Sequence, residues 1–209
     1  MRTTYEQALR DQTSPATMWA DAGIPHRFSG ATLDNYSAPE PGPQVAALNW
    51  AKDYANAFDL ALASGRSALF CGKTGTGKTH LAIAILKHVL RAGCSGRYAL
   101  VYDLIRDVKD TWSQAATKTH TATVSGYTKP DLLVLDEIGV QFGTDAERNI
   151  LFEVLGKRYN DMRPTILISN LQPDDVAKFL GTRVVDRIRE NGGMLVTFTW
   201  DSHRSEPEA

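Results

Sequence analysis

Residues 72–79 read Gly-Lys-Thr-Gly-Thr-Gly-Lys-Thr, and they constrain this 209-residue chain more than any other segment. They match the pattern G-x-x-x-x-G-K-[ST], in which a strand enters a glycine-rich loop and a helix leaves it. The flanking sequence fits this context, because the apolar run 67–71 precedes the loop and the amphipathic run 78–92 follows it. The segment therefore predicts a phosphate-binding loop in an α/β fold.

Each residue type in this loop has a physical role in holding a nucleotide. The glycines allow the backbone to turn its N–H groups inward around phosphate oxygens, and the following helix adds its positive N-terminal end. Lys78 is expected to reach the β- and γ-phosphates, and the Thr79 hydroxyl to ligate Mg²⁺. The residues expected to bind ATP are Gly72, Lys73, Thr74, Gly75, Thr76, Gly77, Lys78, Thr79 and His80.

Short apolar runs alternate with amphipathic runs along the rest of the chain. Strands are predicted at residues 67–71, 98–102, 131–136, 165–169 and 194–200. Helices are predicted at 78–92, 103–116, 144–161, 173–180 and 182–190, with one long helix over 44–65 and a loop over 117–130. Five strands with interleaved helices predict a mainly parallel sheet covered on both faces, which is the three-layer α/β sandwich of P-loop NTPases.

A pair of carboxylates follows the most apolar predicted strand. Residues 132–135 are Leu-Leu-Val-Leu, and Asp136 and Glu137 come directly after them. Ligands of open α/β sheets bind at the carboxyl ends of the strands, so Asp136 is expected to hold Mg²⁺ and Glu137 to activate the attacking water. Asn170 ends the next strand and is placed to contact the γ-phosphate or that water. The alternatives are a solvated acidic pair and a turn-forming Asn.

Two arginines near the C-terminus are candidates for transition-state stabilisation. Arg183 and Arg187 are four residues apart on a predicted helix and therefore share a face. The planar guanidinium suits a γ-phosphate, which makes one of them an arginine-finger candidate. The alternative is a solvated helix face that pairs with Asp186 and Glu190.

Composition excludes several classes of protein. Twenty-three basic and 24 acidic side chains leave a formal net charge of −1, which argues against a strongly basic DNA-coating protein. No apolar run approaches the ~20 residues needed to cross a bilayer, so no membrane association is expected. The N-terminus lacks the apolar core of a secretory signal, and only two cysteines are present, so a cytoplasmic location is expected.

Four segments together resemble the DnaC-type helicase loaders, which are AAA+ ATPases, and the related IstB-type transposition ATPases. The phosphate loop continues as His80-Leu-Ala, and residues 131–141 resemble the acidic strand of these loaders. Residues 181–189 resemble their arginine segment, and residues 198–204 resemble their C-terminal signature. The resemblance runs from about Gly23 to Arg204.

The resemblance implies a function and several residue roles. It implies an ATPase that loads a hexameric replicative DNA helicase onto single-stranded DNA and self-associates, with ATP at the subunit interface. Asn170 falls on the γ-phosphate sensor, Arg187 on an arginine finger acting in trans, and Arg183 on its basic companion. Trp112, beside Lys109, falls on an aromatic position that contacts single-stranded DNA, and Thr144 falls near a second such position. The alternative for Trp112 is a core position facing the sheet.

The resemblance also divides the chain and leaves alternatives open. Residues 1–22 are expected to form a short helical extension, and residues 23–209 the AAA+ ATPase domain, without a C-terminal helical lid. An IstB-like transposition accessory ATPase is the nearest alternative function, followed by a nucleotide-dependent scaffold with little hydrolysis. A small-molecule kinase is disfavoured because Glu137 and Asn170 suit the activation of water rather than of a second substrate.

Overall fold

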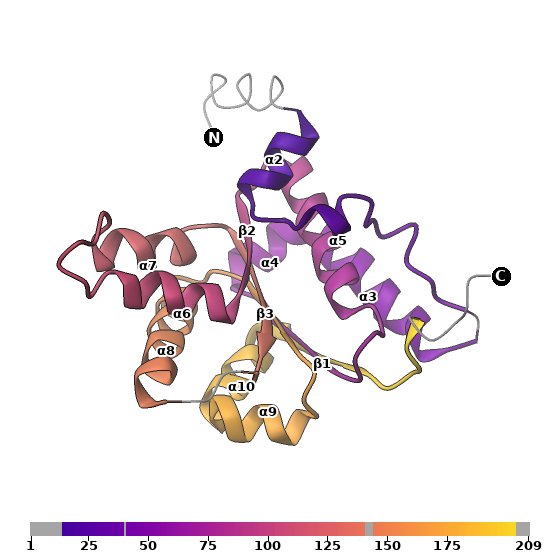
Figure 1. Ribbon diagram of the computed structural model, residues 1–209. Coiled ribbons are helices and arrows are strands. Elements are labelled where there is room, and N and C mark those ends of the chain that lie inside the picture. Colours follow the sequence, from indigo (N-terminus) through magenta and orange to yellow (C-terminus); the bar gives the residue numbers. More distant parts are fainter. Residues whose placement is uncertain (1–13, 40, 141–143, 204–209) are drawn as a thin grey trace.

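Five parallel strands form the centre of the fold in the spatial order β2-β3-β4-β1-β5 (Figure 1). The strands are β1 (Ala68–Gly72), β2 (Gly96–Leu100), β3 (Leu132–Ile138), β4 (Thr165–Ser169) and β5 (Met194–Phe198). The computed structural model describes residues 14–39, 41–140 and 144–203. The predicted α/β class, strand number and parallel pairing are confirmed, with every strand pair parallel.

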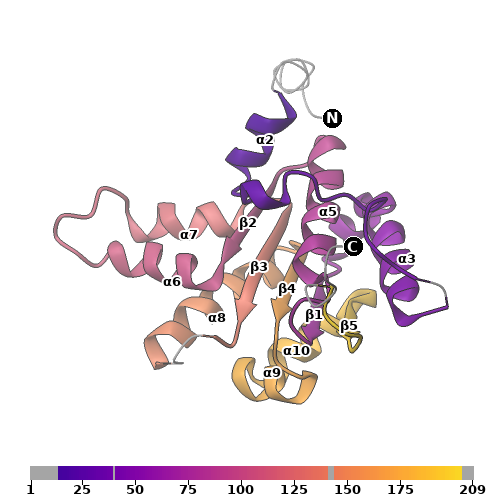
Figure 2. The ribbon, with the colours of Figure 1, turned by 45° about the vertical axis from the view of Figure 1, so that its right-hand side comes forward.

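Helices cover both faces of this sheet (Figures 1 and 2). They are α2 (Pro15–Asp21), α3 (Pro43–Asn56), α4 (Phe58–Ser64), α5 (Lys78–Arg91), α6 (Val101–Asp110), α7 (His120–Thr128), α8 (Asp145–Asn160), α9 (Pro173–Leu180) and α10 (Thr182–Arg189). Two 3₁₀ turns lie at His26–Phe28 and Glu190–Gly192. Within the described ranges, none of the helices is both long and apolar enough to cross a membrane.

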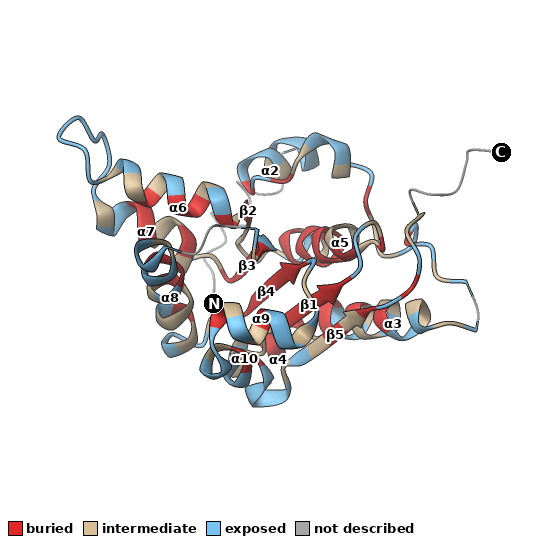
Figure 3. Cartoon of the chain, turned by 60° about the horizontal axis from the view of Figure 1, so that its bottom comes forward, coloured by how far each residue is buried: buried red, intermediate tan, exposed pale blue. Residues whose placement is uncertain are grey.

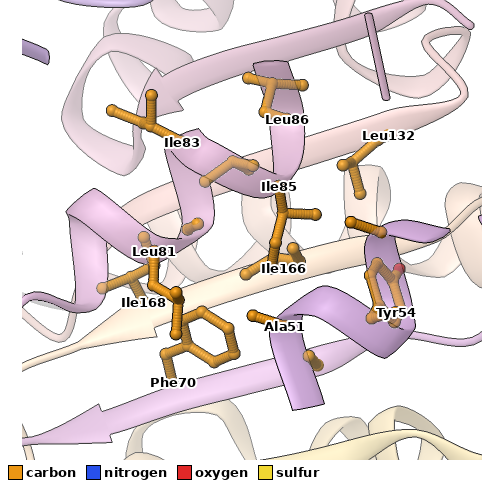
Figure 4. Packing of buried hydrophobic residues seen from close by; sticks show 14 of the residues in the cluster. Ala51, Tyr54, Phe70, Leu81, Ile83, Ile85, Leu86, Leu132, Ile166 and Ile168 are labelled. Carbon is orange, nitrogen blue, oxygen red and sulfur yellow. The ribbon is translucent and has the colours of Figure 1, made fainter. Parts of the chain in front are cut away.

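The two hydrophobic cores follow from the alternation of side chains along the strands. In β1, Phe70 packs with α3 and α5 on one face, whereas Leu69 and Cys71 pack with α6, α8 and α9 on the other. Figure 4 shows the first core, where Leu81 and other side chains of α5 lie against Phe70 and against β4. Full burial of each such side chain contributes about 1.5–3 kcal/mol to the free energy of folding, relative to leaving it exposed. Figure 3 shows that the central strands β1 and β4 are buried along their length, whereas the edge strands β2 and β5 are only partly buried.

Several predicted elements differ from the structure in their limits. The single helix predicted over 44–65 is wrong, because the chain breaks at Ala57 into α3 and α4. No glycine or proline marks this break in the sequence. The strand predicted at 98–102 begins and ends two residues earlier, and the following helix begins at Val101 and ends at Asp110 rather than at residue 116.

Helix α7 lies in the segment predicted to be a loop, and tertiary contacts explain it. Its sequence, HTATVSGYT, is poor in strong helix formers. Val124 and Tyr127 are nevertheless buried against α6 and α8, and the Tyr127 hydroxyl donates to Asp107 at 2.7 Å. The buried guanidinium of Arg158 on α8 donates to the carbonyls of Tyr127 and Thr128 at the end of α7. The helix is thus stabilised by packing rather than by propensity.

The segment before the sheet packs along α5. Ser14 caps α2, and the Ala22 carbonyl accepts a 2.7 Å hydrogen bond from the amide of Tyr98 in β2. Lys87 of α5 is buried, donates to the Ser29 and Ala31 carbonyls, and lies 3.9 Å from the centre of the Trp19 ring. The first 13 residues of the predicted N-terminal extension fall outside the described residues.

Candidate nucleotide-binding site

A cleft of about 550 Å³ opens where β1, β3 and β4 end. Because β4 lies between β1 and β3, the phosphate loop, the acidic pair and Asn170 are brought to one edge of the sheet. The sequence-predicted residues that line this cleft are Thr74, Gly75, Gly77, Lys78, Thr79, His80, Asp136, Glu137 and Asn170. The remaining lining residues are Arg27, Phe28, Asn35, Tyr36, Ser37 and His203.

The phosphate loop is fixed from both sides by aromatic donors. The Tyr36 hydroxyl and the Trp200 indole N–H both donate to the carbonyl of Thr76, at 3.2 Å and 2.9 Å. Gly77 precedes α5 with φ +91°, and a Cβ there would lie 2.7 Å from Cε2 of Tyr36. Glycine is therefore required at this position by both conformation and space.

Lys78 is buried at the base of the loop. Its Nζ donates to the carbonyls of Gly72, at 2.9 Å, and Lys73. An anion in the cleft would add a favourable charge interaction to this buried ammonium. The position of Lys78 in the cleft is therefore compatible with the expected contact to the β- and γ-phosphates.

Thr79 and Asp136 meet across the cleft. The Thr79 hydroxyl donates to Oδ2 of Asp136 at 2.8 Å, and the Tyr98 hydroxyl donates to the same oxygen at 3.0 Å. Burial and the neighbouring Asp136 carboxylate raise the pKa of Tyr98, so this phenol keeps its proton and remains a donor. A hydroxyl and a carboxylate are hard oxygen donors that suit Mg²⁺ when phosphates and water complete its coordination.

Glu137 occupies a strained backbone position at the end of β3. Its φ is +64°, and its amide donates to Oδ1 of Asp136 at 2.7 Å. The pairing of β3 with β4 shifts register between Leu135 and Ile138, which re-aims the side chains there. Glu137 is consequently exposed and lines the cleft beside buried Asp136. Left-handed backbone at a non-glycine residue is typical of functional sites.

The two arginine candidates lie apart from this cleft. Arg183 and Arg187 are exposed on α10 and line a separate cleft of about 490 Å³ between α8 and α10. The Arg187 guanidinium stacks over the Tyr159 ring at 4.5 Å. Neither arginine lines the cleft that contains Lys78 of the same chain.

The DNA-contact candidates gather at the end of α6. Trp112 is 58% exposed, so the alternative of a core tryptophan is wrong. Lys109 pairs with Glu147 at 2.9 Å, and Glu147 also completes the capping box of Thr144 at the start of α8. The Lys109 ammonium therefore lowers the pKa of the Glu147 carboxyl, and one acidic side chain connects Lys109 to Thr144.

Sequence reasoning missed the residues that come to the cleft from distant segments. Tyr98 reaches Asp136 from β2, and Tyr36 and Trp200 reach the phosphate loop from opposite ends of the chain. Their aromatic character gave no signal, since aromatic residues usually belong to the core. Within the described residues, no group of three or more His, Cys, Asp or Glu side chains forms a separate metal site.

Comparison with known proteins gives consistent results. Residues 57–203 match the model of the family described as IstB-like ATP binding protein. The chain is 36% identical over 184 residues to the replicative helicase loader DnaC of Escherichia coli K12, covering 88% of this chain and 73% of that protein. It is 35% identical to the DnaC of Buchnera aphidicola from Acyrthosiphon pisum, with the same coverage.

Solved structures agree with this result. A crystal structure of the DnaC helicase loader superimposes with a TM-score of 0.72 at 30% identity, over 83% of this chain and 99% of that one. DnaA from Aquifex aeolicus bound to AMPPCP shares the fold at 24% identity, with a TM-score of 0.68 over 82% of this chain and 50% of that one. The chain belongs to the DnaC/IstB-like family of AAA+ ATP-binding proteins.

Proposed function

We propose that this protein is an ATPase that loads a replicative DNA helicase onto single-stranded DNA. The observation that carries the ATPase part is the 2.8 Å contact between Thr79 and Asp136, with Glu137 and Asn170 lining the same cleft. The loader part is supported by near full-length similarity to proteins named replicative helicase loaders.

The chemistry assigned to the cleft is the activation of water against a γ-phosphate. The loop amides and Lys78 would hold the phosphates, and Thr79 and Asp136 would hold Mg²⁺, which would neutralise charge on the phosphate oxygens. Glu137 is exposed in the cleft, where it could accept a proton from water, whereas Asp136 is fixed by three hydrogen bonds. Asn170 directly follows β4, the strand between those that carry the two motifs, and would contact the γ-phosphate.

Lys78→Ala is expected to weaken ATP binding about 100-fold, because it removes a charged donor to the phosphates. Isothermal titration calorimetry with ATP and Mg²⁺ would measure this loss. The matched control is Lys178→Ala, which removes a lysine paired only with Asp175 on the surface of α9. Equal ATP affinity in the Lys78 variant and the wild type would refute the phosphate-loop assignment.

The exposed end of α6 is assigned to single-stranded DNA. Trp112 offers an aromatic face for base stacking, and the pairing of Lys109 with Glu147 orders the surface beside it. With a net charge of −1, bulk electrostatics contribute little, so each subunit alone should bind DNA weakly. Binding should become firm when several subunits contact one strand together.

Trp112→Ala should weaken single-strand binding by roughly tenfold, since stacking contributes about 1–3 kcal/mol per base. Fluorescence anisotropy with a labelled oligonucleotide, in the presence of ATP, measures the change. Leu60→Ala is the control, because Leu60 is equally exposed at 60% but lies on α4. An unchanged affinity of the Trp112 variant would remove this residue from the DNA surface.

Capture by the host's replicative helicase tests the loader function directly. We expect the tagged full chain to retain the purified helicase when ATP and single-stranded DNA are present, and to release it as ATP is hydrolysed. Capture of a transposase with no affinity for the helicase would instead support an IstB-like transposition ATPase. Helicase capture without measurable hydrolysis would support a nucleotide-dependent scaffold.

A further inference from the structure

The residues after β5 form a strap over the phosphate loop. Residues 198–203, here called the C-terminal strap, begin with the Phe198 carbonyl, which accepts from the Lys73 amide at 2.9 Å. Trp200 donates to the loop at Thr76, and Asp201 pairs with the Lys73 ammonium at 3.0 Å. The strap ends with the His203 amide, which donates to the Gly75 carbonyl at 3.0 Å. It is thus bound to the loop at successive positions.

His203, at the end of this strap, is one of the residues that line the cleft. Its Nε2 is buried and has no hydrogen-bond partner among the residues that the structure describes. An unsatisfied buried nitrogen is costly, so structures rarely retain one without a partner or a ligand. The strap holds His203 in place, because its backbone is already bonded to the loop.

The phosphate half of a nucleotide already has its expected partners, which are the loop amides and Lys78. The strap is bonded to the loop at the Lys73 amide and at the Thr76 and Gly75 carbonyls. A Cβ on Gly75 would collide with Ser202, so the strap and the loop are in close contact. Since His203 is not one of the phosphate-binding groups, it is expected at the sugar and base.

Other residues that line the cleft have the character expected of a nucleoside pocket. Phe28 and Tyr36 supply aromatic surface, and Asn35 and Ser37 supply polar groups. His80 lies against Tyr36, with ring centres 5.6 Å apart, and is held by the Thr32 carbonyl at 2.9 Å. His203 faces the same cleft from the other end of the chain.

We propose that His203 is a nucleoside-binding residue, whose Nε2 hydrogen-bonds to the sugar or base of the nucleotide held by the phosphate loop. The proposal deepens the ATPase function and rests on nucleotide binding in this cleft. It gives a function to the C-terminal strap, which otherwise only covers the loop. Nucleotide binding would then order the strap through His203 as well as through the loop.

The test compares a nucleoside-containing ligand with one that has phosphates alone. Calorimetry on the full chain would measure ADP and inorganic tripolyphosphate, each with Mg²⁺. His203→Ala should weaken ADP binding about 3- to 10-fold, as expected for the loss of one hydrogen bond, and leave tripolyphosphate unchanged. His203→Gln, which retains a polar side chain, should restore part of the ADP affinity. His120→Ala, which removes a histidine that pairs with Glu153 from α7 and does not line the cleft, should bind both ligands as the wild type does.

Two results would overturn the proposal. Equal weakening of ADP and tripolyphosphate by His203→Ala would mean that the residue acts on the phosphates or on the loop itself. Unchanged ADP affinity would mean that it contacts no part of the nucleotide. Lys78→Ala separates these outcomes from failure of the nucleotide site, because it should abolish binding of both ligands whatever His203 does.

Discussion

Replacing Glu137 with glutamine should reduce ATP hydrolysis by roughly 10²- to 10⁴-fold, the range expected for loss of a general base. ATP binding should remain, because Lys78, Thr79 and Asp136 are untouched and the Glu137 amide still donates to Asp136. Phosphate release under single-turnover conditions measures the rate, and calorimetry measures the affinity. The variant should accumulate in the ATP-bound, DNA-bound assembly.

Glu153→Gln is the matched control, since it removes a carboxylate that pairs with Lys157 and His120 on the surface of α8. Its hydrolysis rate should equal that of the wild type. If Glu137→Gln hydrolyses ATP at the wild-type rate, Glu137 is not the base. Loss of ATP binding together with hydrolysis would instead assign Glu137 a role in shaping the site, through the strained turn that it occupies.

Replacing Arg187 with alanine should leave ATP binding intact and reduce hydrolysis in the assembly by about 10³-fold, as expected for an arginine finger. The reason is geometric: Arg187 is exposed on α10 and lines a cleft separate from the one that contains Lys78 of its own chain. It can therefore assist catalysis only at a neighbouring subunit. Steady-state hydrolysis, measured as a function of protein concentration, gives the effect.

A mixture of two inactive variants tests the action in trans. Arg187→Ala retains an intact cleft, and Lys78→Ala retains an intact Arg187, so mixing them should restore part of the hydrolysis. Arg189→Ala, on the same helix and equally exposed, should retain activity alone. Absence of rescue, or an equal loss of activity in the isolated Arg187→Ala monomer, would contradict action in trans.

The sequence was most informative where local chemistry imposes local structure. The glycine-rich loop, the apolar strand before Asp136 and the helix that begins near residue 144 were all predicted from neighbouring residues. Each of these features is encoded within a few residues, because turn conformation, strand burial and helix capping depend mainly on short-range interactions. The structure places each of them where the sequence indicated.

The sequence was least informative where distant packing overrides propensity. Residues 117–130 lacked helix formers, yet α7 is held there by burial of Val124 and Tyr127 and by donors from Arg158. The break at Ala57 likewise has no local signal. Propensity is a weak prior that a buried face and a few tertiary hydrogen bonds readily outweigh.

By itself, the sequence determined the α/β fold, the phosphate loop and the acidic strand, because these depend on residue types at fixed local spacings. Only the tertiary structure decided that Trp112 is exposed and that Arg187 lies outside the nucleotide cleft of its own chain. It also decided which distant residues converge on that cleft, namely Tyr36, Tyr98, Trp200 and His203. These facts depend on which strands lie side by side and on where the two ends of the chain pack. Spacing along the chain carries no information about contacts made between segments more than one hundred residues apart, such as Trp200 with Thr76.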